Sequence, residues 1–338
     1  MYKNGSCQHA SARGPQYSIV TTDTHDPVTH GRCFVGWNHT FEHVERRPFR
    51  GKVTQLRLGP IQVIQERLEN SMVYRGGGWE GSVMFASFLS TSEHIFLGGH
   101  DATPNTVSAC SWQKQGPAYV AGPNESISVL VQQDLLKDHL DDVLGKGVSW
   151  EALLANFLTS NVKAVEEFQQ EAMNILRKVL DQPECLSNPS SRALLQNQVL
   201  DMLSKLISES DYCLQKLPPP STRSYIIDKA INFMSAHVSE SMSMNDVSSS
   251  IRVSPRTLRY SFEELIGVSP RQYLLALRLN RVRCDLEKAH SPGRVRCIAE
   301  RYGFAHMGRF AAFYYQTFGE MPSDTCKRAA LGKELRTV

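Results

Sequence analysis

The chain has 338 residues, of which 41% are hydrophobic and 21% charged, and its formal net charge at pH 7 is +3. This length suggests two or more domains, with enough apolar content for real cores. No apolar run approaches the ~20 residues of a membrane span, and the N-terminus lacks a signal-peptide core. We therefore expect a cytoplasmic protein.

The first 44 residues are rich in small and polar side chains and show no sustained period. We expect residues 1–44 to be a poorly ordered N-terminal segment. His39 and His43 would share a face on a helix, but no third metal ligand is identifiable, so we interpret them as ordinary surface histidines. The eight cysteines contain no C-x-x-C pair, so neither a zinc site nor a disulfide framework is predicted.

Residues 45–216 are predicted to form a sensor and dimerisation domain. Short alternating runs at 53–58, 61–66, 82–89, 94–97 and 126–131 indicate strands, and glycine-rich turns separate them. Such strands predict an antiparallel barrel or sandwich over residues 50–133. Trp79, Phe85 and Phe88 could line a small-molecule pocket or pack as plain core, and the sequence leaves both interpretations open.

Residues 134–212 are predicted to be helical. Apolar side chains recur every three or four residues along two runs, with a break at 181–189. Two such helices could bury one stripe on the barrel and offer another to a second subunit; the alternative is that every apolar residue packs within one chain. We expect a homodimer formed through Val165, Phe168, Ala172, Ile175, Leu195, Val199, Leu200, Met202, Leu203, Leu206 and Ile207.

Consecutive prolines predict a semi-rigid linker over residues 217–222, followed by an all-α domain over residues 223–330. The charge changes at this boundary. Residues 221–338 hold 18 Lys and Arg against 11 Asp and Glu, whereas the preceding residues hold 19 against 23. A basic domain joined to a mildly acidic one is typical of a nucleic-acid binder with a separate control domain.

The basic domain contains one pattern twice, at 247–270 and at 298–322: a short helix, a tight turn, a second helix and a Gly-x-x-Pro exit. In the first copy Ser254 suits an N-cap and Pro255 the first helical position. In the second copy Gly303 suits the turn. A long helix between the copies could hold both second helices on one side of a duplex, in successive major grooves about 34 Å apart.

These residues resemble the AraC/XylS transcription regulators. The resemblance rests on Leu258 to Pro270 with Arg278 and Leu279, and on Ile298 and Ala299 with Tyr302 to Phe304 and Phe318 with Gly319. It covers roughly the last hundred residues. It implies a C-terminal double helix-turn-helix domain, an N-terminal cupin-like barrel, and a dimeric one-component activator that binds promoter DNA and contacts RNA polymerase. The arrangement is similar in particular to regulators of quorum sensing and virulence, and a small-molecule effector stays open.

By position, the resemblance places the base-contacting residues of the first unit at Arg256, Thr257, Arg259 and Tyr260. In the second unit it places them at Met307, Gly308, Arg309 and Ala312, with His306 within reach. The candidate phosphate ligands are Arg271, Arg301 and Lys327.

Three residues, Gly308, Ala312 and Arg252, depart from the family pattern in ways that matter. Gly308 and Ala312 stand where longer polar side chains are usual, so base recognition by the second unit stays open. Arg252 stands where a turn glycine is usual, and we expect backbone strain there.

The alternative function is a cupin-type enzyme or metabolite-binding protein with an accessory helix-turn-helix domain. The metal-binding histidine and glutamate pattern of cupins is absent, so we predict no enzyme, no metal and no cofactor.

Overall fold

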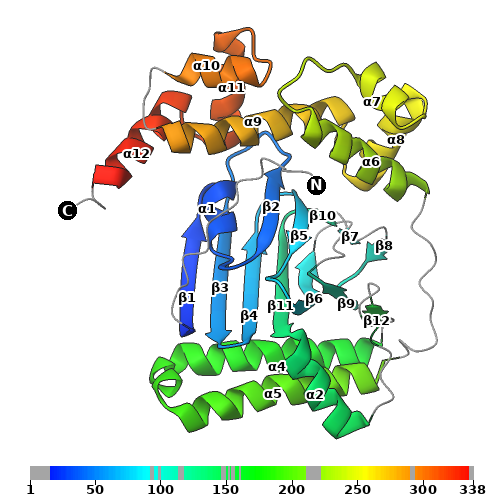
Figure 1. Ribbon diagram of the computed structural model, residues 1–338, viewed down its shortest axis with the longest axis vertical. Helices are drawn as coiled ribbons and strands as arrows, with labels where there is room; N and C mark the ends of the chain where they lie inside the picture. Colours follow the sequence, from blue (N-terminus) through cyan, green and yellow to red (C-terminus); the bar gives the residue numbers. More distant parts are fainter. Residues whose placement is uncertain are drawn as a thin grey trace.

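The computed structural model describes residues 16–91, 95–97, 100–112, 118–145, 150, 153, 157–159, 161–210, 222–289 and 294–334. A β domain with helices at its far end carries an all-helical C-terminal domain on its opposite side (Figure 1). The predicted fold class is confirmed, since all strand pairings in the described residues are antiparallel. The predicted linker at 217–222 lies outside the described residues apart from its last position.

The β domain consists of two sheets, whose strand orders are β1-β3-β4-β11-β6-β9-β12 and β2-β5-β10-β7-β8. A two-residue turn at Gly59 and Pro60 joins β3 to β4, with Leu58 opposite Ile61 and Gly59 at φ +64. The strands are β1 (Tyr17–Thr24), β2 (Asn38–His43), β3 (Gly51–Leu58), β4 (Ile61–Leu68), β5 (Met72–Gly77), β6 (Ser82–Thr91), β7 (Ile95–Leu97), β8 (His100–Ala102), β9 (Val107–Ser111), β10 (Ala118–Val120), β11 (Asn124–Gln132) and β12 (Phe157–Thr159).

The expectation of a poorly ordered N-terminal segment is wrong for the described residues 16–44. They form β1, helix α1 (Pro27–Arg32) and β2. Strand β1 pairs with β3 along its whole length, from Tyr17 opposite Leu58 to Thr24 opposite Gly51. His43 lies on β2 and is fully buried, so it is not a surface histidine. The order of this segment comes from pairing with distant strands, which its own sequence period does not reveal.

The helices α2 (Gln133–Leu144), α4 (Val162–Asp181), the short 3-10 helix η1 (Pro183–Ser187) and α5 (Pro189–Ser208) follow β11. Asn161 and Asn188 cap α4 and α5, and Pro189 occupies the first turn of α5. The residues predicted to contact a second subunit lie instead in the core that these helices share with the larger sheet, and none is more than 5% exposed. The expected contact surface is therefore wrong, because this chain buries both stripes itself.

The C-terminal domain is built on α9 (Pro270–Ala289), which lies across the end of the β domain with α10 and α11 on its far side (Figure 1). One core holds α6 (Thr222–Ala236), α7 (Met244–Ser250) and α8 (Pro255–Leu265) against the first half of α9. A second core holds α10 (Val295–Arg301), α11 (Met307–Phe318) and α12 (Pro322–Glu334) against the second half. The two predicted helix-turn-helix units, α7–α8 and α10–α11, thus sit at the two ends of one helix.

The two domains are joined by contacts along one face of α9. The Asn280 side-chain amide donates a hydrogen bond to the backbone carbonyl of His43 at 3.1 Å, and the Tyr273 hydroxyl donates one to the Glu42 carboxylate. Apolar residues add to the interface, since Val44 and Val73 of the β domain belong to the core of the first unit. Helix α9 therefore contacts the β domain with one face and the helix-turn-helix units with its other faces.

Candidate nucleic-acid interface

Helix α8 presents the predicted base-contacting residues outward. Arg256, Thr257, Arg259 and Tyr260 are all exposed, while Leu258 on the opposite face is buried. The helix begins as predicted, because the Ser254 hydroxyl accepts a hydrogen bond from the backbone N–H of Thr257 at 3.0 Å and Pro255 follows the cap. The geometry gives this helix a buried ridge and a free polar face, as a recognition helix requires.

The long donors on α8 are held only by weak local contacts. The Arg256 guanidinium donates to the Tyr260 hydroxyl at 3.2 Å and lies over its ring, and Arg259 pairs with Glu263 at 2.8 Å. An exposed pair of this kind contributes little stability. Arginine can therefore exchange it for the paired acceptors of a guanine edge in the major groove at small cost.

Helix α11 presents fewer long polar side chains than α8 at the predicted positions. His306 occupies the N-cap but makes no capping hydrogen bond, and Met307 is half-buried in the core of the second unit. No atom lies within 4 Å of the position a Gly308 side chain would occupy, and Ala312 is exposed but short. Arg309 is exposed and is the longest donor of the predicted set.

Sequence reasoning missed two exposed residues on α11. Tyr315 is 56% exposed and Gln316 is also exposed. They follow Ala312 by three and four residues, so they lie one turn further along the same face. That spacing was the available signal, and it extends the polar face of α11 beyond the positions taken from the family pattern.

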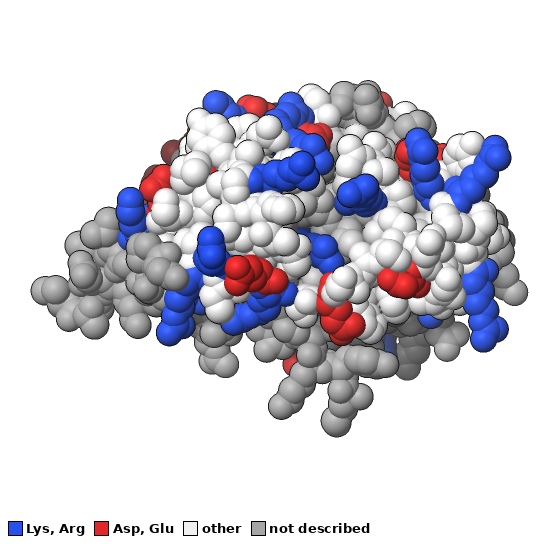
Figure 2. Space-filling view, turned by 90° about the horizontal axis from the view of Figure 1, so that it is seen from above, with Lys and Arg blue, Asp and Glu red and all other residues white. Residues whose placement is uncertain are grey.

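The predicted phosphate ligands differ in how freely they are presented. Arg301 pairs with Asp285 at 3.3 Å, and Lys327 pairs with Asp324 at 3.6 Å. Arg271 is exposed in the first turn of α9. Figure 2, which looks onto the end of the molecule that carries α7, α8, α10 and α11, shows Lys and Arg side chains spread over this surface with Asp and Glu between some of them.

A cleft of about 730 Å³ separates the two units. Its charged and imidazole side chains are Arg46, Arg271, Arg278, Arg309 and His306, and no Asp or Glu is among its described lining residues. Arg278 donates hydrogen bonds to the backbone carbonyls of Val238 and Glu240 at 3.3 and 2.8 Å, and its guanidinium lies against Gly303. Arg278 therefore ties the first unit to the turn of the second.

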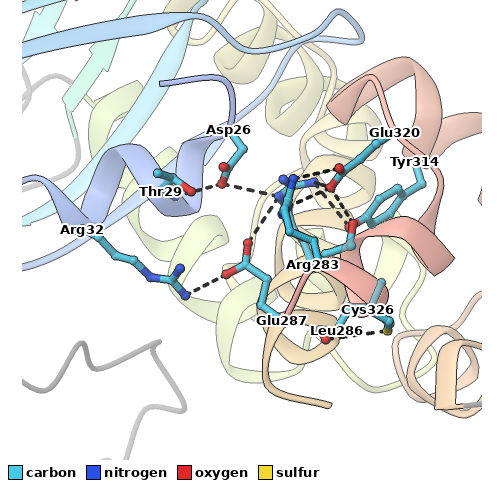
Figure 3. Close-up of polar contacts among 11 residues, drawn as sticks. Asp26, Thr29, Arg32, Arg283, Leu286, Glu287, Tyr314, Glu320 and Cys326 are labelled. Carbon is cyan, nitrogen blue, oxygen red and sulfur yellow. Dashed lines mark hydrogen bonds and ion pairs between the residues drawn. The ribbon is translucent and has the colours of Figure 1, made fainter. Parts of the chain in front are cut away.

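A buried polar cluster joins the second unit to the β domain (Figure 3). Arg283, only 1% exposed, lies 3.5 Å from Asp26, 3.8 Å from Glu287 and 3.0 Å from Glu320. Burial alone would lower the pKa of Arg283, but Tyr314 and the three carboxylates raise it above its ordinary value. Burial likewise opposes ionisation of Asp26, yet Arg283 and the hydrogen bonds from Thr29 hold the pKa of Asp26 below its usual value.

Other candidate sites are weaker. Phe85, Phe88 and Trp79 lie in three separate apolar clusters. In the described residues no group of three or more His, Cys, Asp or Glu side chains could hold a metal ion. No helix in the described part of the chain is both long and apolar enough to cross a membrane.

Comparison with known proteins places the similarity mainly in the C-terminal half. A family described as "Helix-turn-helix domain" matches residues 247–328. The probable thc operon regulatory protein of Rhodococcus erythropolis is 32% identical over 166 residues, which are 47% of this chain and 46% of that protein. The XylDLEGF operon transcriptional activator 3 of Pseudomonas putida is 30% identical over 138 residues, 40% of this chain and 39% of that protein. The chain thus spans less than half the length of these curated relatives.

Solved structures also match long stretches of this chain. The AraC-like transcriptional activator CuxR covers 83% of this chain and 99% of its own, with 14% identity and a TM-score of 0.40.

Proposed function

We propose that this chain, which belongs to the AraC/XylS family of helix-turn-helix transcription regulators, recognises a specific promoter sequence and activates transcription. The observation that carries the proposal is the presentation of Arg256, Arg259 and Tyr260 on a recognition helix whose other face is buried. The matched relative from Pseudomonas putida is described as a transcriptional activator, which favours activation over repression.

The first unit supplies most of the base discrimination in this proposal. Its recognition helix carries two arginines and a tyrosine, whereas the predicted positions of α11 carry a glycine and an alanine beside Arg309. The 20 residues of α9 span about 30 Å, close to the 34 Å that separates successive major grooves on one face of a duplex. The spacing supports engagement of both grooves by one subunit, with α11 contributing through Arg309, Tyr315 and Gln316.

The division of labour between domains is part of the proposal. Residues 45–216 serve as the sensor domain and residues 223–330 as the DNA-binding domain. A homodimer, contact with RNA polymerase, a small-molecule effector and a role in quorum sensing or virulence rest on the family resemblance and stay predictions. The matched relatives are transcription regulators, so the alternative of a cupin-type enzyme has no supporting observation.

The test is selection of bound duplexes from a random pool by the full-length protein, followed by titration of variants on the selected duplex. We expect an enriched site, and we expect Arg259→Ala to weaken binding to it by about 10- to 100-fold and to relax specificity at the contacted base. Lys327→Ala should weaken target and random duplexes alike. Equal loss by Arg259→Ala on both duplexes would contradict the role of Arg259, and the absence of any enriched site would contradict specific recognition.

A further inference from the structure

The loop between β2 and β3, residues 44–50, reaches past α9 to the second helix-turn-helix unit. Arg46 places its guanidinium carbon 4.9 Å from the ring centre of Phe313 on α11, and Pro48 lies against Gly319 at the end of the same helix. The loop is anchored beneath these contacts, since Phe49 is buried and Asn70 donates a hydrogen bond to the Pro48 carbonyl at 3.2 Å. A side chain of the sensor domain is thus held at the DNA-binding domain.

The side chain of Arg46 is exposed, and it has no charged partner in the described part of the chain. The neighbouring Arg47 differs, because it pairs with Glu45 and donates to the Glu69 carbonyl. The ring of Phe313 contacts Arg46 through a cation–π interaction, which leaves the N–H donors of the guanidinium available to an acceptor. Arg46 is therefore oriented by its surroundings without being neutralised by them.

The cleft that Arg46 lines has the charge of an anion-binding site. Arg271, Arg278 and Arg309 line it together with His306, and its described lining residues include no carboxylate. The N-terminal ends of α9 and α11 also open onto it, at Ser269 and His306. The first turn of α11 has no side-chain cap for its backbone N–H groups, and the partial positive charge of both helix N-termini adds to the attraction for an anion.

The position of the cleft indicates which anion it meets. It lies between the two helix-turn-helix units, so a duplex that enters both must pass its phosphate backbone across the cleft on the way from one major groove to the next. Arginine is well suited to phosphate oxygens because its planar guanidinium can donate two parallel hydrogen bonds.

We propose that Arg46, a residue of the sensor domain, binds a DNA phosphate in the cleft between the two helix-turn-helix units. The inference rests on the proposed function, because it requires a duplex bound across both units. Its consequence is that the sensor domain contributes to DNA affinity directly, through the β2–β3 loop, as well as through its contacts with α9.

The test compares three variants on the selected duplex and on a random duplex, with binding measured from 50 to 200 mM salt. Arg46→Met keeps an apolar stem against Phe313 and removes the charge, whereas Arg46→Lys keeps the charge. Arg50→Met is the matched control, since Arg50 lies in the same loop, is exposed and does not line the cleft. All three variants should keep the wild-type melting temperature.

One lost phosphate contact reduces the slope of log affinity against log salt by about 0.9. We therefore expect the affinity ratio of wild type to Arg46→Met to shrink about 3.5-fold between 50 and 200 mM salt, equally on both duplexes, because 0.9 times the logarithm of a fourfold salt change corresponds to that factor. Arg46→Lys and Arg50→Met should keep the wild-type slope.

An unchanged slope in Arg46→Met would overturn the proposal. A similar affinity loss in Arg46→Met and Arg46→Lys with an unchanged slope would also overturn it, since packing on Phe313 would then be the role of Arg46. Failure of the proposed function would look different: wild type itself would bind the selected and random duplexes equally.

Discussion

Replacing Arg283 by methionine tests whether the buried polar cluster holds the second helix-turn-helix unit to the β domain. Arg283→Met fills a similar space but removes the cation that lies within 4 Å of all three carboxylates. Glu287 keeps its ion pair with Arg32 at 2.7 Å, and Glu320 keeps the one with Arg328 at 2.9 Å. Asp26, which is 7% exposed, keeps its hydrogen bonds from the backbone and side chain of Thr29 but no ion pair within 4 Å in the described residues.

The expected loss of unfolding free energy follows from the contacts that each carboxylate keeps. Removing one partner of a buried ion pair costs about 3–5 kcal/mol, because an uncompensated charge stays buried. Two of the three carboxylates retain a cation, so we expect a loss near the lower end, about 3 kcal/mol of unfolding free energy at pH 7. In the wild type the lowered pKa of Asp26 contributes stability above its unfolded pKa, and this contribution is lost as pH falls through the folded value. The deficit of the variant should therefore shrink in acid.

Urea unfolding followed by circular dichroism at several pH values measures this deficit. Arg32→Met is the control, because Arg32 contacts the same cluster from its half-exposed edge and should cost no more than about 1 kcal/mol. An Arg283→Met protein within about 1 kcal/mol of the wild type at pH 7 would refute the reasoning, since the threshold is the value of an ordinary surface ion pair.

Two further predictions concern the backbone and pH. Arg252 has φ +57, and Arg252→Gly relieves about 1–2 kcal/mol of left-handed strain against about 0.5–1 kcal/mol of added chain entropy. Thermal denaturation should show an equal or slightly higher melting temperature, and a clear decrease would speak against strain. Burial lowers the pKa of His43 to about 4. Its contribution to the free energy of unfolding is therefore complete above pH 6.5 and falls by roughly 3 kcal/mol towards pH 4, because the unfolded state binds the proton first. His43→Phe should flatten the stability profile in that window, and an unaltered profile would exclude His43 as its source.

Local signals predicted the C-terminal domain well, because its elements begin and end with residues whose effect is confined to one turn. Ser254 with Pro255 starts α8, and Gly303, at φ +80, makes the turn before α11. The strain expected at Arg252 is also a local property, and its positive φ confirms it. The same signals place the predicted base-contacting side chains of α8 on its exposed face.

The features that sequence reasoning missed depend on distant partners. Strand β1 is rich in threonine and acquires its order by pairing with β3, whose paired residues lie 27 to 41 positions further along the chain. An apolar stripe on α4 or α5 predicts that its residues are buried, but it does not indicate which surface covers them. The prediction that Leu200 and Leu203 contact a second subunit is therefore wrong, because the core of the chain itself contains them. The contact of Arg46 with Phe313 joins two domains, and no period or spacing in the sequence indicates it.

In the proposed mode of binding, in which both units contact one duplex, the anchoring of α9 limits the DNA sites that fit. Arg278 holds the first unit to the turn of the second, and Arg283, on the same helix, holds the second unit to the β domain. Inserting one base pair between the two contacted elements moves the second by about 3.4 Å along the duplex and turns it by about 35° around the axis. Since the protein cannot follow that rotation, the duplex must undertwist to restore the phase. Operators should therefore tolerate changes in base sequence more readily than changes in the spacing between the two contacted elements.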